Sequence, residues 1–193
     1  STQYGYTESA SEAPIGPKFL RGTDINKTSY IDWGSVPYCS ISEDDHAKYK
    51  LSQGDICIIR MADPGKTSIV EEDVDSVFAS YLIRLAITTS EITPYFLFYF
   101  LTSDSYQGYI TGASTGTTRK SASAPVITDV PINVPSDSLL RNFDSEITPL
   151  RTRLNVLLKS NQNLRKTRDL LLPKLISGQL DVEELDIDIN TDV

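Results

Sequence analysis

The stretch RTRLNVLLKSNQNLRKTRDLLLPKLISGQL, residues 151–180, decides how the rest of the chain is interpreted. Its apolar residues recur at helical spacing, and the pattern extends upstream to Leu140. Written as heptads, the a positions are Leu140, Ile147, Leu154, Asn161 and Arg168, and the d positions are Phe143, Leu150, Leu157, Leu164 and Leu171. Every d position is apolar over more than four heptads, which is typical of a coiled-coil seam. We therefore predict a long C-terminal coiled-coil helix within residues 138–180.

Prolines and caps predict where this helix is interrupted and where it ends. Pro149 should kink or restart the helix, with Thr148 as a new N-cap. Pro173 should end the helix, and Gly178 should close the turn that follows. Residues 181–193 carry six acidic residues and no Lys or Arg, so we expect an acidic tail that frays.

The apolar seam of the predicted helix needs a cover. Each leucine left in water forfeits about 1.5–3 kcal/mol, and ten seam positions together exceed the net stability of a domain. One interpretation is that the helix lies back on its own domain. We favour a second long helix, because Asn161 at an a position is the kind of polar residue that fixes register between helices. That helix belongs either to a second copy or to a part of the chain not included here.

Residues 1–137 predict a mixed, β-rich domain, so the fold class is α+β. Short apolar runs bounded by Gly, Pro and Asp predict strands. These runs are residues 18–25, 55–60, 66–70 and 77–88, the last being long enough for a central strand. Residues 92–110 switch to helical spacing, with Thr93 as N-cap and Pro94 at the first helical position. Residues 126–135 predict a final edge strand, because Pro131 cannot donate to a sheet.

The charge of the chain is divided between its parts. The formal net charge of −8 combines −7 for residues 1–138, +5 for residues 139–180 and −6 for residues 181–193. Phosphate neutralisation dominates nonspecific affinity for nucleic acid, so this balance argues against a nonspecific DNA or RNA coat. A small basic face remains compatible with it, because the position of the cations matters more than their sum.

Catalytic and metal-binding patterns are weak throughout. The segment DPGKTS (63–68) resembles the end of a phosphate-binding loop, but that motif requires Gly where the chain has Arg60. His46 is the only histidine, and we interpret it as a solvated loop residue. We interpret the acidic runs 43–45 and 71–73 as hydrated loops with no metal. Cys39 and Cys57 indicate no disulfide framework. No apolar run is long enough for a membrane span, and the cytoplasm is the expected location.

Cations and hydroxyl side chains gather in three loops of the β-rich domain. Two cations lie beside Thr117, Thr118 and Ser121 in a segment whose glycines permit close approach of the backbone, which suits contact with phosphates and base edges. Ordinary surface loops are also rich in Lys and Ser, and this alternative stays open. The candidate DNA-binding residues are Lys18, Arg21, Lys27, Arg60, Lys66, Thr117, Thr118, Arg119, Lys120 and Ser121.

The order of several segments resembles a known family. FLRGTDI, YKLSQGDICIIRMADPGK and FASYLIRL are followed by a small-residue loop, by DVPINVPS, and by a helix that ends in RDLLLPKLISGQLDV. This order is similar to that of type I restriction–modification specificity subunits, with one target-recognition domain at 1–137 and one long helix at 138–180. The resemblance runs from about residue 4 to residue 182, and LLLPKLISGQL is its most specific part.

The resemblance implies a noncatalytic subunit. Each recognition domain of that family reads one half of a bipartite double-stranded DNA sequence, and the long helices pair antiparallel. The loops 18–27, 60–67 and 114–121 would then face DNA, and the seam would join two helices. The helices also dock modification subunits, which carry S-adenosylmethionine, while a separate restriction subunit uses ATP and Mg²⁺. No cofactor is expected on this chain.

The chain departs from the family in having one recognition domain and one helix in place of two of each. It is therefore a natural half-subunit or one half of a longer subunit, and self-association through the helix is expected. The acidic recognition domain favours weak DNA binding alone and tighter binding in the full assembly. The alternative is an oligomerisation or scaffold module whose β-rich domain binds protein and not DNA.

Overall fold

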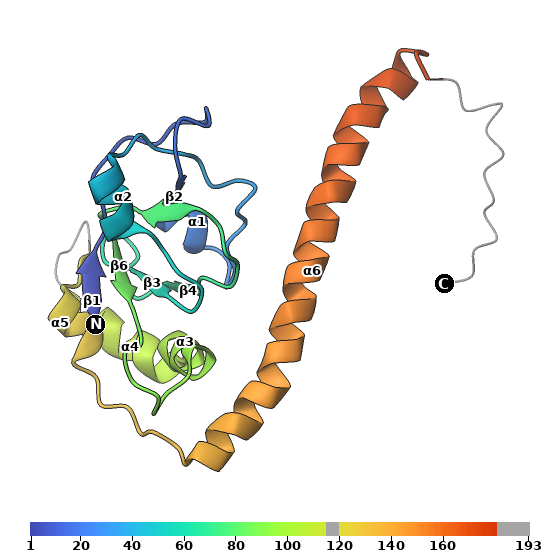
Figure 1. Cartoon of the computed structure of the whole chain (residues 1–193). Coiled ribbons are helices and arrows are strands. Elements are labelled where there is room, and N and C mark those ends of the chain that lie inside the picture. Colours follow the sequence, from blue (N-terminus) through green and yellow to red (C-terminus); the bar gives the residue numbers. More distant parts are fainter. Residues whose placement is uncertain (115–119, 181–193) are drawn as a thin grey trace. The chain divides into compact units, whose positions relative to one another are not determined.

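The structure is a computed structural model, and it describes residues 1–114 and 120–180. The chain divides into two compact units, Ser1–Leu150 and Arg151–Val193. We name the first unit the head, and the helical residues 151–176 of the second unit the distal helix. Figure 1 shows the elements of both units.

A four-stranded antiparallel sheet forms the centre of the head. Its strands are β1 (Thr2–Tyr4), β3 (Ile56–Ile59), β4 (Thr67–Ile69) and β6 (Leu82–Leu85), in the order β1-β6-β3-β4. All four residues of β3 are buried, because both faces of the sheet are covered. Ile56 and Ile58 belong to the core on one face, and Cys57 and Ile59 to the core on the other.

Different elements cover the two faces of the sheet (Figure 1). One face packs against α3 (Pro94–Thr102), α4 (Asp104–Ala113) and α5 (Ala124–Thr128), with Phe98 and Tyr106 in that core. The other face packs against the parallel pair β2 (Lys18–Leu20) and β5 (Ser76–Phe78) and against α1 (Gly22–Ile25). Helix α2 (Glu43–Tyr49) contacts β5. The sheet is therefore the middle layer of three.

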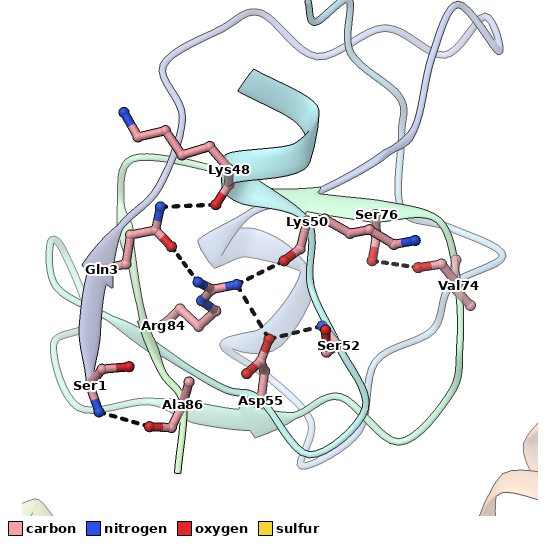
Figure 2. Close-up of polar contacts among 10 residues, drawn as sticks. All are labelled: Ser1, Gln3, Lys48, Lys50, Ser52, Asp55, Val74, Ser76, Arg84 and Ala86. Carbon is pink, nitrogen blue, oxygen red and sulfur yellow. Dashed lines mark hydrogen bonds and ion pairs between the residues drawn. The ribbon is translucent and has the colours of Figure 1, made fainter. Parts of the chain in front are cut away.

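Arg84 on β6 holds the first strand and the segment after α2 to the sheet, as Figure 2 shows. Its guanidinium donates to the backbone carbonyl of Lys50 and to the side-chain oxygen of Gln3. It also lies 3.6 Å from the Asp55 carboxylate. Burial raises the pKa of Asp55, and the Ser52 N–H and the Arg84 charge act in the opposite direction. The sequence patterns did not reveal this network of Arg84 with Gln3, Lys50 and Asp55.

Helix α6 (Asp137–Ile176) is a single helix of 40 residues, which corresponds to a length of about 60 Å. Its first turns belong to the head. Leu140 is 5% exposed, and the ring of Phe143 lies edge-on to the rings of Phe96 and Tyr99. Thr93, the N-cap of α3, donates to the Asp144 carboxylate at 2.9 Å. The predicted long helix and the predicted cap at Thr93 are thus confirmed.

Four predicted elements differ from the structure in the head. The predicted strand at 18–25 ends at Leu20, because α1 occupies Gly22–Ile25, where the Asp24 carboxylate accepts from the Arg21 N–H. The predicted edge strand at 126–135 is wrong, because α5 occupies Ala124–Thr128, with Pro125 in its first turn where a missing N–H costs nothing. The predicted long strand 77–88 is divided into β5 and β6, which belong to different sheets. The predicted helix 92–110 is divided at Ser103, which ends α3 and caps α4 by accepting from the Tyr106 N–H.

Other corrections concern helix ends. The acidic run 43–45, which we interpreted as a hydrated loop, is the start of α2, because the Ser42 hydroxyl accepts from the Asp45 N–H as an N-cap. Helix α6 continues through both prolines, so the predicted restart at Pro149 and the predicted end at Pro173 are wrong. Each proline removes one helical hydrogen bond without ending the ladder on either side. Gly178 has a φ of +69° and closes the turn after the helix, as predicted.

Candidate nucleic-acid interface

The turn between β3 and β4 carries two of the predicted cations and is held in one conformation. Gly65 has a φ of +95°, and its N–H donates to the Ile59 carbonyl at 2.9 Å. A Cβ at Gly65 would lie 2.9 Å from a methyl carbon of Ile110, so the backbone approaches α4 closely here. The Gln107 side chain on α4 donates to the Gly65 carbonyl at 2.8 Å. These contacts fix the turn against the helix layer.

The segment after the small-residue loop pairs with this turn. Met61 and Ser121 form an antiparallel bridge, and the Ala62 N–H donates to the Lys120 carbonyl at 3.0 Å. The Ala122 N–H donates to the Arg60 carbonyl at 2.9 Å. Two of the three predicted loops are therefore adjacent. Thr117, Thr118 and Arg119 lie outside the described residues, and their assignment stays a prediction.

Three of the predicted cations are engaged within the head. Lys18 donates to the Val36 carbonyl at 2.6 Å and lies over the Tyr38 ring. Arg21 forms two hydrogen bonds with the Asp24 carboxylate, and this contact raises the pKa of the guanidinium. Arg60 donates to the Ser80 carbonyl and stacks on the Tyr4 ring. These three side chains therefore contact their own chain. Only Arg21 had a local signal for this in the sequence, the Asp24 at i+3, and the sequence analysis did not use it.

Lys27 and Lys66 lie on one small recess of about 200 Å³. Its wall also includes Asn26, Thr28, Thr102 and Gln107. Lys27 follows α1 and Lys66 ends the β3–β4 turn, so the structure brings together two cations 39 positions apart in the chain. Lys120 is exposed beside the same turn. We name this cavity, defined by Asn26, Lys27, Lys66 and Gln107, the lysine recess.

A larger groove of about 440 Å³ lies beside the lysine recess, and Asn26 lines both. Arg21 and Thr23 from the first loop, and Met61 and Asp63 from the turn, contribute to its wall. Apolar surface comes from Phe19 and Tyr81, among others. The first loop and the β3–β4 turn therefore meet at this groove, and Ser121 of the third loop pairs with Met61 of the same turn.

The predicted seam residues divide between the two units. Leu140 and Phe143 pack within the head, and Ile147 is partly exposed. Further along α6, Leu150 is 63% exposed, Leu157 57%, Leu164 66% and Leu171 40%. Leu154 is intermediate, Asn161 is exposed, and Arg168 forms hydrogen bonds with its neighbour Asp169. The d positions from Leu150 onward thus remain an exposed apolar ladder on the helix.

Neither a metal cluster nor a membrane helix is present in the described part of the chain. Within residues 1–114 and 120–180, no group of three His, Cys, Asp or Glu side chains is placed to hold a metal ion. None of the helices described there is long and apolar enough to span a membrane. His46 lies on α2, not in a loop as predicted, and its Nε2 is 2.7 Å from the Asp75 carboxylate. Both thiols are buried.

A comparison with known protein families identifies the family that this sequence matches. Residues 15–149 match the family described as the type I restriction modification DNA specificity domain. This match covers more than half of the chain and includes all three loops described above. No curated protein matches the chain.

Solved structures show the same fold at low sequence identity. The S subunit of a type I restriction–modification system from M. genitalium is 18% identical, with a TM-score of 0.64 over 95% of this chain and 44% of that chain. The HsdS subunit from Thermoanaerobacter tengcongensis is 17% identical, with a TM-score of 0.52 over 93% and 43%. A chain from a study of assembly of the type I R-M system is 15% identical, with a TM-score of 0.58 over 90% and 42%. This chain therefore spans less than half the length of these relatives.

Proposed function

Because this chain belongs to the family of type I restriction modification DNA specificity domains, we propose that it is a noncatalytic subunit that reads one half of a bipartite DNA sequence. The observation that carries the proposal is that the described parts of the three cation-bearing loops are neighbours. Residues of the first loop and of the β3–β4 turn line the recess and the groove together, and Ser121 forms a bridge with Met61 of that turn. Base edges are read by side chains presented from such loops, while contacts to phosphates fix the register.

The exposed ladder of the distal helix supports a pairing function for the same chain. Each d-position leucine has 40–66% of its surface exposed, and an isolated helix has nothing to bury it against. The occupant that we propose is a second long helix, from a second copy of this chain or from the other half of a longer subunit. Pairing of two identical copies has two-fold symmetry, so the two DNA half-sequences would be inverted repeats.

The partners that we propose follow the family. Modification subunits would dock on the helical part and bring S-adenosylmethionine, and a restriction subunit would bring ATP and Mg²⁺. This chain would hold no cofactor and would act in the cytoplasm. The head carries 17 Asp and Glu against 10 Lys and Arg over residues 1–138, so affinity for DNA should be tight only in the assembly.

Selection from random duplex DNA tests the proposal. The full chain with its modification subunit is incubated with a random-sequence duplex pool, and the retained fraction is sequenced. We expect one short sequence to be enriched, and Arg119→Ala with Lys120→Ala to weaken binding and alter the enriched bases. Lys50→Ala is the control, because Lys50 lines neither the recess nor the groove. Failure of the wild-type assembly to enrich any sequence would favour the scaffold alternative.

A further inference from the structure

The lysine recess differs from the rest of the head in its charge. The head is acidic, yet no Asp or Glu lines the recess, and two of its lining residues are lysines. In residues 1–114 and 120–180, neither Lys27 nor Lys66 forms a side-chain hydrogen bond, an ion pair or a ring contact within the chain. Lys18, Arg21 and Arg60 are all engaged internally. Among the described residues, no side chain pairs with either lysine of the recess.

The wall of the recess is held in place by internal hydrogen bonds. Gln107 donates to the Gly65 carbonyl at 2.8 Å and to the Leu101 carbonyl at 2.7 Å. The Thr67 hydroxyl donates to the Gly65 carbonyl, and the Thr28 hydroxyl to the Tyr30 carbonyl. These groups are occupied with backbone acceptors, so they shape the recess and leave the lysines as its available donors. A site formed before its ligand arrives loses less entropy on binding.

Asn26 supplies a second observation that points to a ligand. Its Oδ1 atom is buried and has no hydrogen-bond partner, although the residue lines both the recess and the groove. A buried polar atom without a partner is rare in a folded protein. The Nδ2 atom of the same carboxamide is not buried in this way, so it is the N–H donor that Asn26 presents at the wall of the recess. A phosphate oxygen in the recess would accept from it.

We propose that the lysine recess is a seat for one backbone phosphate of the DNA duplex, bound by Lys27, Lys66 and Asn26. This inference rests on the proposed function and deepens it, because it assigns different tasks to neighbouring residues. The phosphate held in the recess fixes the register of the head on DNA and carries no sequence information. The groove beside it, which the β3–β4 turn lines in part, is left to read base edges.

The dependence of DNA affinity on salt tests this assignment. The assembly is titrated with the random duplex pool between about 50 and 200 mM salt, the range in which phosphate contacts dominate the change in affinity. For Lys27→Gln with Lys66→Gln, we expect the slope of log affinity against log salt to fall by about 0.9, which corresponds to one phosphate. The enriched sequence should stay that of the wild type. An unchanged slope, or a changed enriched sequence, would overturn the proposal.

Matched variants control for charge and folding. Lys27→Arg with Lys66→Arg keeps both charges and should retain the wild-type slope. Lys50→Gln removes an exposed lysine outside the recess and should also retain it. If the double glutamine variant fails to fold, Lys66→Gln alone decides, because this side chain is exposed and its loss should not unfold the head. A slope for Lys66→Gln equal to that of Lys50→Gln would contradict the phosphate seat.

Inorganic phosphate distinguishes the source of the anion. Thermal unfolding of the chain is measured in phosphate and in chloride at equal ionic strength. A rise in melting temperature that depends on phosphate and is lost in the glutamine variant, together with an unchanged DNA slope, would assign the recess to free phosphate and overturn the proposal. The two proposals are contradicted by different results. If the wild-type assembly enriches no sequence, the proposed function is wrong. If a sequence is enriched but the slope is unchanged, only the phosphate site is wrong.

Discussion

In the head, Leu20, Leu51 and Leu82 expose 0–2% of their surface, whereas in the distal helix Leu157, Leu164 and Leu170 expose 57–68%. Burial of a leucine contributes about 1.5–3 kcal/mol, so the same side chain stabilises the head and leaves the helix without that gain. The head has three layers that cover one another. Among residues 151–180 the distal helix has one apolar ladder and no second layer, and a second long helix is the cover that we propose for it.

The two regions also differ in charge. Residues 1–150 carry a net charge of −8 and residues 151–180 a net charge of +6. An acidic head that binds DNA must concentrate its free cations, and the lysine recess is where two of them meet. Under the proposed function, the comparison separates two tasks: recognition by a few positions in the head, and assembly by a repeated pattern along the helix.

The largest effect is expected from charges placed in the ladder. Leu157→Asp with Leu164→Asp removes four leucines from a paired interface, each contributing about 1.5–3 kcal/mol, so association should be lost at micromolar concentration. Sedimentation velocity measures the fraction of paired chain. Lys166→Gln is the control, because it changes the net charge by the same amount per site at an outer heptad position. If the double aspartate variant still pairs, the leucine ladder is not the interface between the two chains.

A smaller effect distinguishes the cores of the two regions. Leu101 is 3% exposed in the head and Leu170 is 68% exposed on the distal helix. Leu101→Ala should lower the free energy of unfolding of the head by about 2–5 kcal/mol, because it leaves a cavity. Leu170→Ala should change it by no more than about 0.5 kcal/mol. Urea denaturation followed by tryptophan fluorescence measures both, since Trp33 lies in the head. If both variants lowered the free energy of unfolding equally, the contrast between a buried core in the head and exposed leucines on the distal helix would be contradicted.

The smallest effect concerns the thiols, which are both in the head. Burial raises the pKa of Cys39 from 9.0 to about 11 and raises that of Cys57 as well. Above pH 9 the unfolded chain loses the Cys39 proton that the folded head keeps, so stability should fall as the pH rises from 9 to 11. Cys39→Ala should reduce this dependence without abolishing it, because Cys57 contributes in the same direction. At pH 8, a thiol reagent should label neither cysteine until urea unfolds the head, and labelling of the folded chain would contradict the buried assignment.

Local patterns predicted the elements whose signals lie within a few residues. Thr93 before Pro94 marked the start of α3, and the leucine repeat marked α6. The break at Ser103 and the helix at Ala124–Thr128 were missed. Serine and proline are common both at helix starts and in loops, so neither residue distinguishes the two. Helix α6 continues through Pro149 and Pro173 although proline usually ends a helix, so here the repeated leucine pattern was the better guide to its extent.

The candidate site depended more on tertiary contacts. The three loops could be identified from their composition, but their proximity depends on the Met61–Ser121 bridge between segments 60 positions apart. The engagement of Lys18 by the Val36 carbonyl likewise has no local signal. Arg21 was the exception, because Asp24 follows it at the i+3 spacing of an ion pair. Which cations remain free is a property of the fold, and the sequence does not reveal it.

Light scattering on the wild-type chain, over a range of concentrations, tests most directly whether the ladder is covered by a second long helix. The chain has a mass of 21.4 kDa, and we expect twice that value, falling toward 21.4 kDa only on dilution or with aspartates in the ladder. A constant mass of 21.4 kDa at every concentration, with the helix protected from amide exchange, would contradict the account.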